Sequence, residues 1–202
     1  MQTREAVIVS GARTAIGNFM GSLESLNAID LGTIAFNAAI ERAGIKGEMV
    51  ESLVASHCGQ SAYPGNSARL ISLACGMDFD SASVSVHQQC PSSLRAAEII
   101  ADEIMLGKVD IGGVVGIESM TNYPYILLNA RKGYRLGDGE VLHDGLMLGG
   151  LICPWNGYHM GVTAENIADM YGITREEQDE LALLSHQRLV RVFKEVWLRE
   201  GL

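Results

Sequence analysis

A single cysteine lies where the sequence predicts that a strand ends and a helix begins. Cys90 follows the alternating stretch 81–87 and precedes Pro91, and proline suits the first position of a helix. The free N–H groups and the dipole of a first helical turn stabilise negative charge on sulfur, and a thiolate is the form that attacks an acyl carbonyl. The same N–H groups could hold the oxyanion that this attack creates. Cys90 is therefore a candidate nucleophile for acyl transfer; the alternative is a small cysteine that only packs in the core.

The other cysteines and the histidines show no metal-binding pattern. Cys58, Cys75 and Cys153 are widely spaced and form no C-x-x-C pair, which argues against a zinc site or a redox dithiol. In a reducing compartment they are free thiols. Four histidines also lack the spacing of metal ligands, and we interpret them as structural or exposed: His57, His87, His143 and His186. No metal ion is predicted.

Composition narrows the class of protein. The chain has 202 residues, of which 48% are hydrophobic and 19% charged, as in a globular protein with a substantial core. The formal charge of -9 argues against a general nucleic-acid binder, which needs a basic face. No apolar run reaches the roughly 18 residues of a membrane-spanning helix. The first residues lack the basic-then-apolar layout of a signal peptide, so we expect a cytoplasmic protein without a membrane partner.

The hydrophobic pattern predicts alternating strands and helices. Strands are expected over 6–10, 81–87 and 110–117, with a short helix-to-strand stretch over 50–56. Helices are expected over 27–43, 67–75 and 91–106, each followed by a glycine, and another helix starts at Thr174 with the capping box that Thr174 forms with Glu177. This alternation is typical of an α/β fold with a layered, mostly parallel sheet.

The middle of the chain has a different character. From about residue 118 to 161, glycines, tyrosines and charges mix with little periodicity, which indicates a long excursion such as a lid or a subunit contact. We predict a core domain over 1–120 and a loop subdomain over 121–202. Arg131, Lys132 and Arg135 form a basic cluster in this excursion. It could contact phosphate groups or simply form a solvated loop face.

Six segments resemble motifs of the thiolase family and follow one another in the family's order. They are VIVSGARTAIG (7–17), GNSAR (65–69), CPSSLRA (90–96), GIESM (116–120), NGYHMGVTAENIA (156–168) and TREEQDEL (174–181). One such match would be weak, but six over nearly the whole chain are specific. The chain therefore resembles the N-terminal half of a thiolase.

The resemblance implies a function and a set of site residues. Thiolases interconvert 3-ketoacyl-CoA plus CoA with acyl-CoA plus acetyl-CoA through an S-acyl cysteine, without a metal or a tightly held cofactor. By this match Cys90 is the nucleophile and Leu151 an apolar pocket residue. His159 and Met160 match residues beside the bound pantetheine and acyl end. The alternatives are a capped or core histidine and a methionine that only packs. CoA thioesters are the implied ligands, and the family's oligomers imply an oligomer.

The chain also departs from the family pattern. Thiolases are roughly twice this length, and their second half carries a G-H-P histidine, a second cysteine in a C-G-G-G-type segment and an N-E-A-type asparagine, none of which is present here. We therefore expect activity to need a complementary C-terminal chain; the alternative is an inactive truncated fragment or a non-enzymatic binding module. Ser93 replaces the family's glycine, and serine would be strained there if the backbone had a positive φ. Acyl chain length and the direction of reaction stay open.

Overall fold

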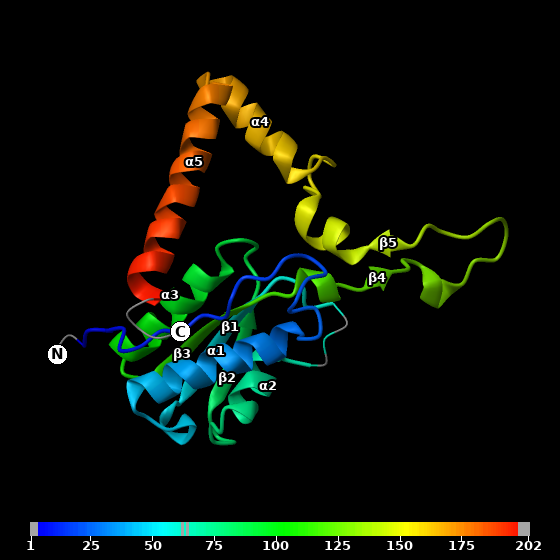
Figure 1. The fold of residues 1–202 in the computed structure, drawn as a ribbon. Helices are drawn as coiled ribbons and strands as arrows, with labels where there is room; N and C mark the ends of the chain where they lie inside the picture. Colours follow the sequence, from blue (N-terminus) through cyan, green and yellow to red (C-terminus); the bar gives the residue numbers. More distant parts are fainter. Residues whose placement is uncertain (1–3, 62, 64, 198–202) are drawn as a thin grey trace. The chain divides into compact units, whose positions relative to one another are not determined.

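A computed structural model describes residues 4–61, 63 and 65–197 of the chain. The chain divides into two compact units, Met1–Leu151 and Ile152–Leu202, and each is described by itself (Figure 1). The division predicted from the sequence, a core domain over 1–120 and a loop subdomain over 121–202, stays a prediction.

The first unit is built on a parallel sheet of three strands. These are β1 (Ser52–His57), β2 (Ala82–Val86) and β3 (Gly112–Ile117), in the order β2-β1-β3. Val54 of β1 lies opposite Val84 of β2 and Val114 of β3. Every residue of β1 is buried because it is central and covered on both faces. The predicted parallel sheet is confirmed.

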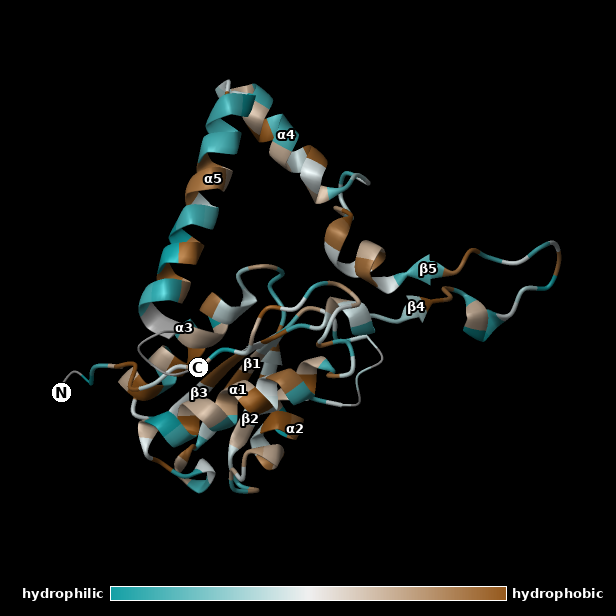
Figure 2. Ribbon diagram, viewed as in Figure 1, coloured by the Kyte–Doolittle hydropathy of each residue, from teal (hydrophilic) through white to brown (hydrophobic). Residues whose placement is uncertain are grey.

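Helices cover both faces of this sheet. α1 (Ala28–Ala43) and α2 (Ser67–Ala74) pack on one face, and α3 (Ser92–Met105) packs on the other. Figure 2 shows hydrophobic residues, coloured brown, in these strands and helices. Leu53 and Ala55 join the core under α1 and α2, whereas Val54 joins the core under α3, because successive strand residues point to opposite faces. The three helices predicted over 27–43, 67–75 and 91–106 are present within two residues.

The helix ends follow the chemistry expected of their sequences. The Asn27 side chain accepts hydrogen bonds from the N–H groups of Ile29 and Asp30, and Gly44 ends α1 with φ 68°. The Asn66 side chain does more than cap α2. Its Oδ1 accepts from Arg69 N–H at 3.3 Å and from Ser85 Oγ at 2.8 Å, and its Nδ2 donates to the carbonyl of Ser83 at 2.9 Å. Asn66 therefore joins the start of α2 to the edge strand β2.

The strand predicted over 6–10 is wrong for this structure. Residues 6–10 form no strand within the described chain, and Val7, Ile8 and Val9 are 69%, 96% and 76% exposed. Apolar composition predicts burial, but a strand also needs a neighbouring backbone with which to pair. A cavity of about 700 Å³ lies between this segment, β3, α1 and α3, and it separates the segment from the sheet.

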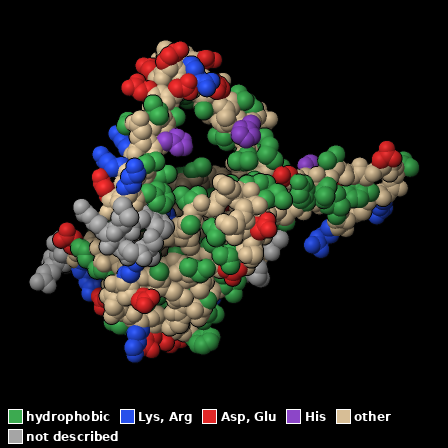
Figure 3. Space-filling view, viewed as in Figure 1, with side chains coloured by type: hydrophobic (Ala, Val, Ile, Leu, Met, Phe, Trp, Pro, Cys, Tyr) green, Lys and Arg blue, Asp and Glu red, His purple; other side chains and the backbone are tan. Residues whose placement is uncertain are grey.

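The residues after β3 form a hairpin and several short turns. β4 (Tyr125–Ile126) pairs antiparallel with β5 (His143–Asp144). A 3₁₀ turn at Met120–Asn122 precedes β4, another at Ala130–Lys132 lies between the two strands, and a π-helical turn at Met147–Leu151 follows β5. A further 3₁₀ turn, Gly47–Met49, precedes β1. Figure 3 shows hydrophobic atoms along the hairpin among charged groups. The basic cluster of Arg131, Lys132 and Arg135 is exposed there, and its role stays untested.

The second unit contains α4 (Met160–Tyr171), α5 (Arg175–Val192) and a π-helical turn at Phe193–Trp197. The predicted capping box is confirmed, since Thr174 Oγ1 accepts from Glu177 N–H at 3.2 Å and Glu177 Oε2 accepts from Thr174 N–H at 2.8 Å. Among the described residues, no helix combines the length and apolar character needed to cross a membrane.

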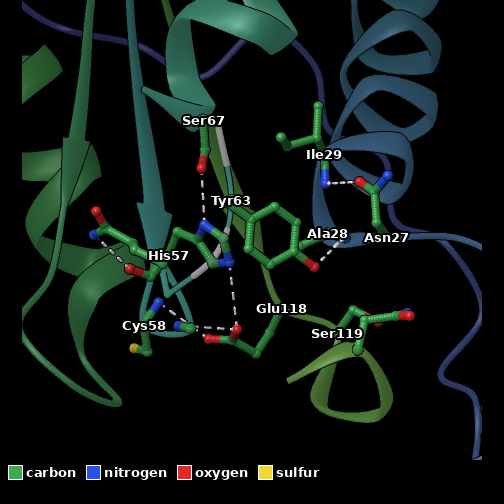
Figure 4. Close-up of polar contacts among 12 residues, drawn as sticks. Asn27, Ala28, Ile29, His57, Cys58, Tyr63, Ser67, Glu118 and Ser119 are labelled. Atoms are coloured by element: carbon green, nitrogen blue, oxygen red, sulfur yellow. Dashed lines mark hydrogen bonds and ion pairs between the residues drawn. The ribbon is translucent and has the colours of Figure 1, made fainter. Parts of the chain in front are cut away.

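His57 closes β1 and links three elements. Its side chain is 1% exposed, its Nδ1 lies 2.9 Å from Ser67 Oγ, and its ring contacts the ring of Tyr63 edge-on at 4.7 Å (Figure 4). Tyr63 Oη accepts from Ala28 N–H at 3.2 Å, which adds α1 to the connection. Burial lowers the pKa of His57, although the nearby Glu118 opposes this effect. His57 is structural, one of the two alternatives that its sequence context left open.

We expect Asn66→Ala to lower the free energy of unfolding by about 2 kcal/mol, since it removes the cap of α2 and the bonds to Ser83 and Ser85. Asn66→Ser keeps a capping oxygen and should cost about half as much. Urea unfolding followed by circular dichroism measures both. Equal midpoints for wild type and Asn66→Ala would contradict this account of the α2–β2 connection.

The buried His57 predicts loss of stability in mild acid. With its folded-state pKa below the ordinary value of 6.5, the unfolded chain binds the proton first, so stability present above pH 6.5 falls as the pH decreases below it. The expected slope from this one group is at most about 1.4 kcal/mol per pH unit. Denaturant titrations between pH 7.5 and 5.5 should show a shallower slope for His57→Gln than for wild type. His186→Gln, at an exposed position of α5, should keep the wild-type slope.

Candidate active site

Cys90 lies in the turn between β2 and α3. Pro91 is the N-cap residue of α3, the helix itself begins at Ser92, and no side chain of the described residues caps this end. The N–H groups of a first helical turn have no acceptors within their own helix, and the Cys90 turn directly precedes this end of α3; of these groups, the Ser92 N–H bonds to the carbonyl of Gln89. Cys90 is exposed. The predicted strand–cysteine–helix arrangement is therefore confirmed, and the alternative of a buried cysteine that only packs does not fit this position.

Gln89 gives the turn its shape. Its φ is 53°, a left-handed conformation that costs free energy for a residue with a side chain. Its carbonyl oxygen accepts from Ser92 N–H at 3.1 Å, from Ser92 Oγ at 2.5 Å and from Cys58 Sγ at 3.3 Å. Ser92 Oγ in turn accepts from Gln88 N–H at 2.7 Å. These bonds hold the strained turn, and they thereby fix the position of the Cys90 backbone.

Ser93 does not suffer the strain that a positive φ would impose. It lies inside α3 with helical backbone, and the positive φ occurs at Gln89 instead. Its hydroxyl lies 2.6 Å from Ser56 Oγ at the end of β1. A Cβ at Gly116 would lie 2.5 Å from Ser93 Oγ, so the absence of a side chain on β3 makes room for this serine. The pair links α3 to the sheet beside Cys90.

A pocket of about 380 Å³ opens beside the turn. Cys90 and Leu151 both line it, so the structure brings together two residues that the sequence proposed for one site. Leu151 ends the π-helical turn Met147–Leu151. The remaining lining residues mix small polar groups with apolar ones: Ser56, Cys58, Gln89, Ser92, Ser93, Gly116, Ile117, Glu118, Met120, Tyr123, Leu146 and Gly150. A thioester carbonyl at this pocket could meet both the Cys90 sulfur and the first-turn N–H groups of α3.

Glu118 organises the loop that follows β1. Its carboxylate accepts from Cys58 N–H at 3.1 Å and from Gly59 N–H at 3.2 Å, and it lies 3.7 Å from His57 Nε2 (Figure 4). A Cβ on Gly59 would collide with the ring of Tyr123, so this loop packs tightly on the pocket wall. Burial and the Glu118 charge raise the pKa of Tyr123.

Cys58 is a pocket residue that sequence reasoning missed. It lies directly after β1, half-buried, and burial raises the pKa of its thiol. Its sulfur contacts the carbonyl of Gln89 and lies 3.8 Å from Ser92 Oγ. No motif marked it, because the two segments that meet here are distant in sequence. Glu118 and Ser92 did lie within matched motifs, which were the available signal.

The other two predicted site residues belong to the second unit. His159 is the N-cap of α4, where its Nδ1 accepts from Gly161 N–H at 2.9 Å, and the half-exposed Met160 is the first residue of that helix. Ile152 and His159 form an antiparallel bridge that closes the loop before α4. His159 therefore caps α4, a role that the sequence analysis did not predict. Its contact with a ligand, and that of Met160, stay predictions.

Comparisons with known proteins agree with this geometry. The sequence model of the family described as "Thiolase, N-terminal domain" matches residues 6–199. An acetyl-CoA acetyltransferase from Escherichia coli is 45% identical over 186 residues, which cover 92% of this chain and 47% of that protein. An acetyl-CoA acetyltransferase from Syntrophomonas wolfei is 42% identical over 91% of this chain and 46% of its own length.

Solved structures match in the same way. The structure of the Syntrophomonas wolfei acetyl-CoA acetyltransferase has a TM-score of 0.88 and covers 96% of this chain and 48% of that one. A thiolase from Ascaris suum, solved in complex with coenzyme A, has a TM-score of 0.91 at 30% identity, over 98% of this chain and 51% of that one. The chain thus spans about half the length of the relatives it matches. It has the thiolase-like fold, and it belongs to the thiolase family through that family's N-terminal domain.

Proposed function

We propose that this chain supplies the nucleophilic half of a thiolase, with Cys90 as the residue that becomes acylated. The observation that carries the proposal is the exposed Cys90 at the uncapped start of α3, beside a pocket that Leu151 also lines. The Cys90 thiolate attacks the carbonyl carbon of an acyl-CoA, the α3 amides stabilise the oxyanion, and the CoA thiolate leaves. The S-acyl group then passes to CoA or to the α-carbon of acetyl-CoA.

CoA thioesters are the proposed ligands. The relatives are named acetyl-CoA acetyltransferases, and the Ascaris suum thiolase was solved with coenzyme A. In our proposal His159 and Met160 contact the pantetheine and acyl end, and Leu151 contacts the acyl group. No metal or tightly held cofactor takes part. We further propose a cytoplasmic location and an oligomer; one relative, from Gibberella zeae, is named a cytosolic enzyme.

Among the described residues that line the pocket, none is placed to activate Cys90 as a free base. Among the described residues that line it there is no histidine, and the Glu118 carboxylate already accepts hydrogen bonds from Cys58 and Gly59. A general base must lie within hydrogen-bond reach of the proton it takes. We therefore propose that a C-terminal thiolase half completes the site. The same observation favours the second candidate, a module that binds without turnover, when that half is absent.

Acylation of Cys90 tests the proposal directly. Acetyl-CoA mixed with the chain and a C-terminal thiolase half should leave one acetyl group on Cys90, because the thiolate then has both a base and an oxyanion site. Intact-mass spectrometry with peptide mapping detects this adduct. Cys90→Ala should abolish it, and Cys153→Ser, in the second unit, should retain it. If wild type carries no adduct with the added half present, the binding module is the better description.

Ser92 should act as a positioning residue for Cys90. Ser92→Ala leaves Gln88 N–H without its acceptor and removes the shortest bond to the Gln89 carbonyl, at a cost of about 1–3 kcal/mol. If about 1.4 kcal/mol of this cost appears as loss of the productive turn, acylation slows about tenfold. Ser83→Ala, which removes a serine hydroxyl on β2 away from the pocket, is the matched control. Stopped reactions followed by mass spectrometry give both rates, and unchanged acylation in Ser92→Ala would exclude this role.

A further inference from the structure

Two thiols open onto the same pocket, and only one has a role in the proposed reaction. Cys90 is exposed and Cys58 is half-buried, and both line the pocket. The other two cysteines lie elsewhere: Cys75 is buried at the end of α2, and Cys153 belongs to the second unit. The function proposed above leaves Cys58 unused.

The contacts of Cys58 place its sulfur beside the Cys90 turn. Its Sγ lies 3.3 Å from the carbonyl oxygen of Gln89, the residue before Cys90. It also lies 3.8 Å from Ser92 Oγ, two residues after Cys90. The Cys58 sulfur therefore faces the short segment whose middle carries the other thiol. The two residues also follow β1 and β2, neighbouring parallel strands whose carboxyl ends share one edge of the sheet.

Hydrogen bonds hold the backbone beside each thiol in place. Glu118 binds the N–H of Cys58, and Ser92 holds both Gln88 and Gln89. A disulfide needs Cα atoms roughly 4.4–6.8 Å apart and a suitable rotation about each Cα–Cβ bond. Rotation of the Cys58 side chain toward Cys90 would give up its weak S–H hydrogen bond to the carbonyl of Gln89.

We propose that Cys58 is the resolving partner of Cys90, so that mild oxidation by a hydroperoxide closes a reversible Cys58–Cys90 disulfide over the pocket. The Cys90 thiolate attacks the peroxide, whose O–O bond breaks, and becomes a sulfenic acid while hydroxide leaves. Cys58 then attacks the sulfenic sulfur, gives up its proton and displaces hydroxide, which leaves as water. Overall, two thiols and one hydrogen peroxide give one disulfide and two waters.

The environments of the two thiols set their order of reaction. Cys58 is protonated at neutral pH because burial raises the pKa of its thiol, so it reacts slowly with free peroxide. Cys90 is more exposed and lies at the start of a helix, which favours first attack there. In the second step, the high effective concentration of an intramolecular thiol compensates for the small fraction of Cys58 that is ionised. The disulfide would block S-acylation and protect Cys90 from irreversible oxidation.

Peroxide treatment of the full, reduced chain tests the inference without an activity assay. After an equimolar dose of hydrogen peroxide, wild type should lose two alkylatable thiols and the mass of two hydrogen atoms, and proteolysis should give a peptide that joins Cys58 to Cys90. Dithiothreitol should restore both thiols. In Cys58→Ser, a cyclic 1,3-dione should capture the Cys90 sulfenic acid, and continued oxidation should give a sulfinic acid that dithiothreitol does not reduce. Cys153→Ser should behave as wild type.

Two controls keep the outcomes distinct. Cys58→Ala, checked with Cys58→Ser by circular dichroism, separates loss of the thiol from loss of the fold. Irreversible oxidation of Cys90 to the same extent in wild type and in folded Cys58 variants would overturn the inference, as would a disulfide that joins any other pair.

The inference rests on the proposed function only through the reactivity of Cys90. A disulfide without acylation by acetyl-CoA would count against the function alone, and acylation without a disulfide against the inference alone.

Discussion

The site depends on one carbonyl oxygen, that of Gln89. A left-handed backbone at a residue with a side chain is unfavourable by itself, and it persists only where surrounding bonds compensate for it. Here three donors from two separate elements converge on the Gln89 oxygen: the N–H and hydroxyl of Ser92 from α3, and the thiol of Cys58 from the end of β1. The turn that carries Cys90 thus takes its shape from the packing of α3 and β1 on each other.

The side chains at the end of the central strand β1 point alternately to its two faces, and these side chains make the contacts around the site. Ser56 points to the α3 side and meets Ser93, His57 points to the α2 side and meets Ser67, and Cys58 follows where the strand ends. Glu118, directly after the neighbouring strand β3, then binds the backbone of Cys58. Parallel strands bring their carboxyl ends to one edge, so the polar groups that leave the core there gather around the same pocket.

Much of this could be predicted from sequence, because much of it is local. Helix caps, the alternation of β2 and the cysteine before Pro91 depend on residues within a few positions of one another, and the thiolase motifs supplied the fold. The roles of Cys58 and Ser93 could not be predicted, since each depends on a partner more than thirty residues away, Gln89 and Ser56 respectively. The strand expected over 6–10 failed for a related reason: its apolar residues predict burial, but pairing depends on a neighbouring backbone that local sequence does not reveal.

The acyl transfer that we propose has two chemical tasks, and the described residues fit only one of them. The first task is to orient the sulfur atom and stabilise an oxyanion, and our proposal assigns it to the Gln89 turn and the start of α3. To remove the thiol proton, and later a proton from the α-carbon of acetyl-CoA, requires a base and an acid that reach the pocket, and its described lining contains no histidine for either task. Under this proposal, orientation of Cys90 rests on this chain, and its activation rests on a complementary C-terminal half. Because hydrogen bonds already hold the turn, Cys90 can be in position before a C-terminal half binds. We therefore expect that half to add the activating groups to a nucleophile site that is already formed.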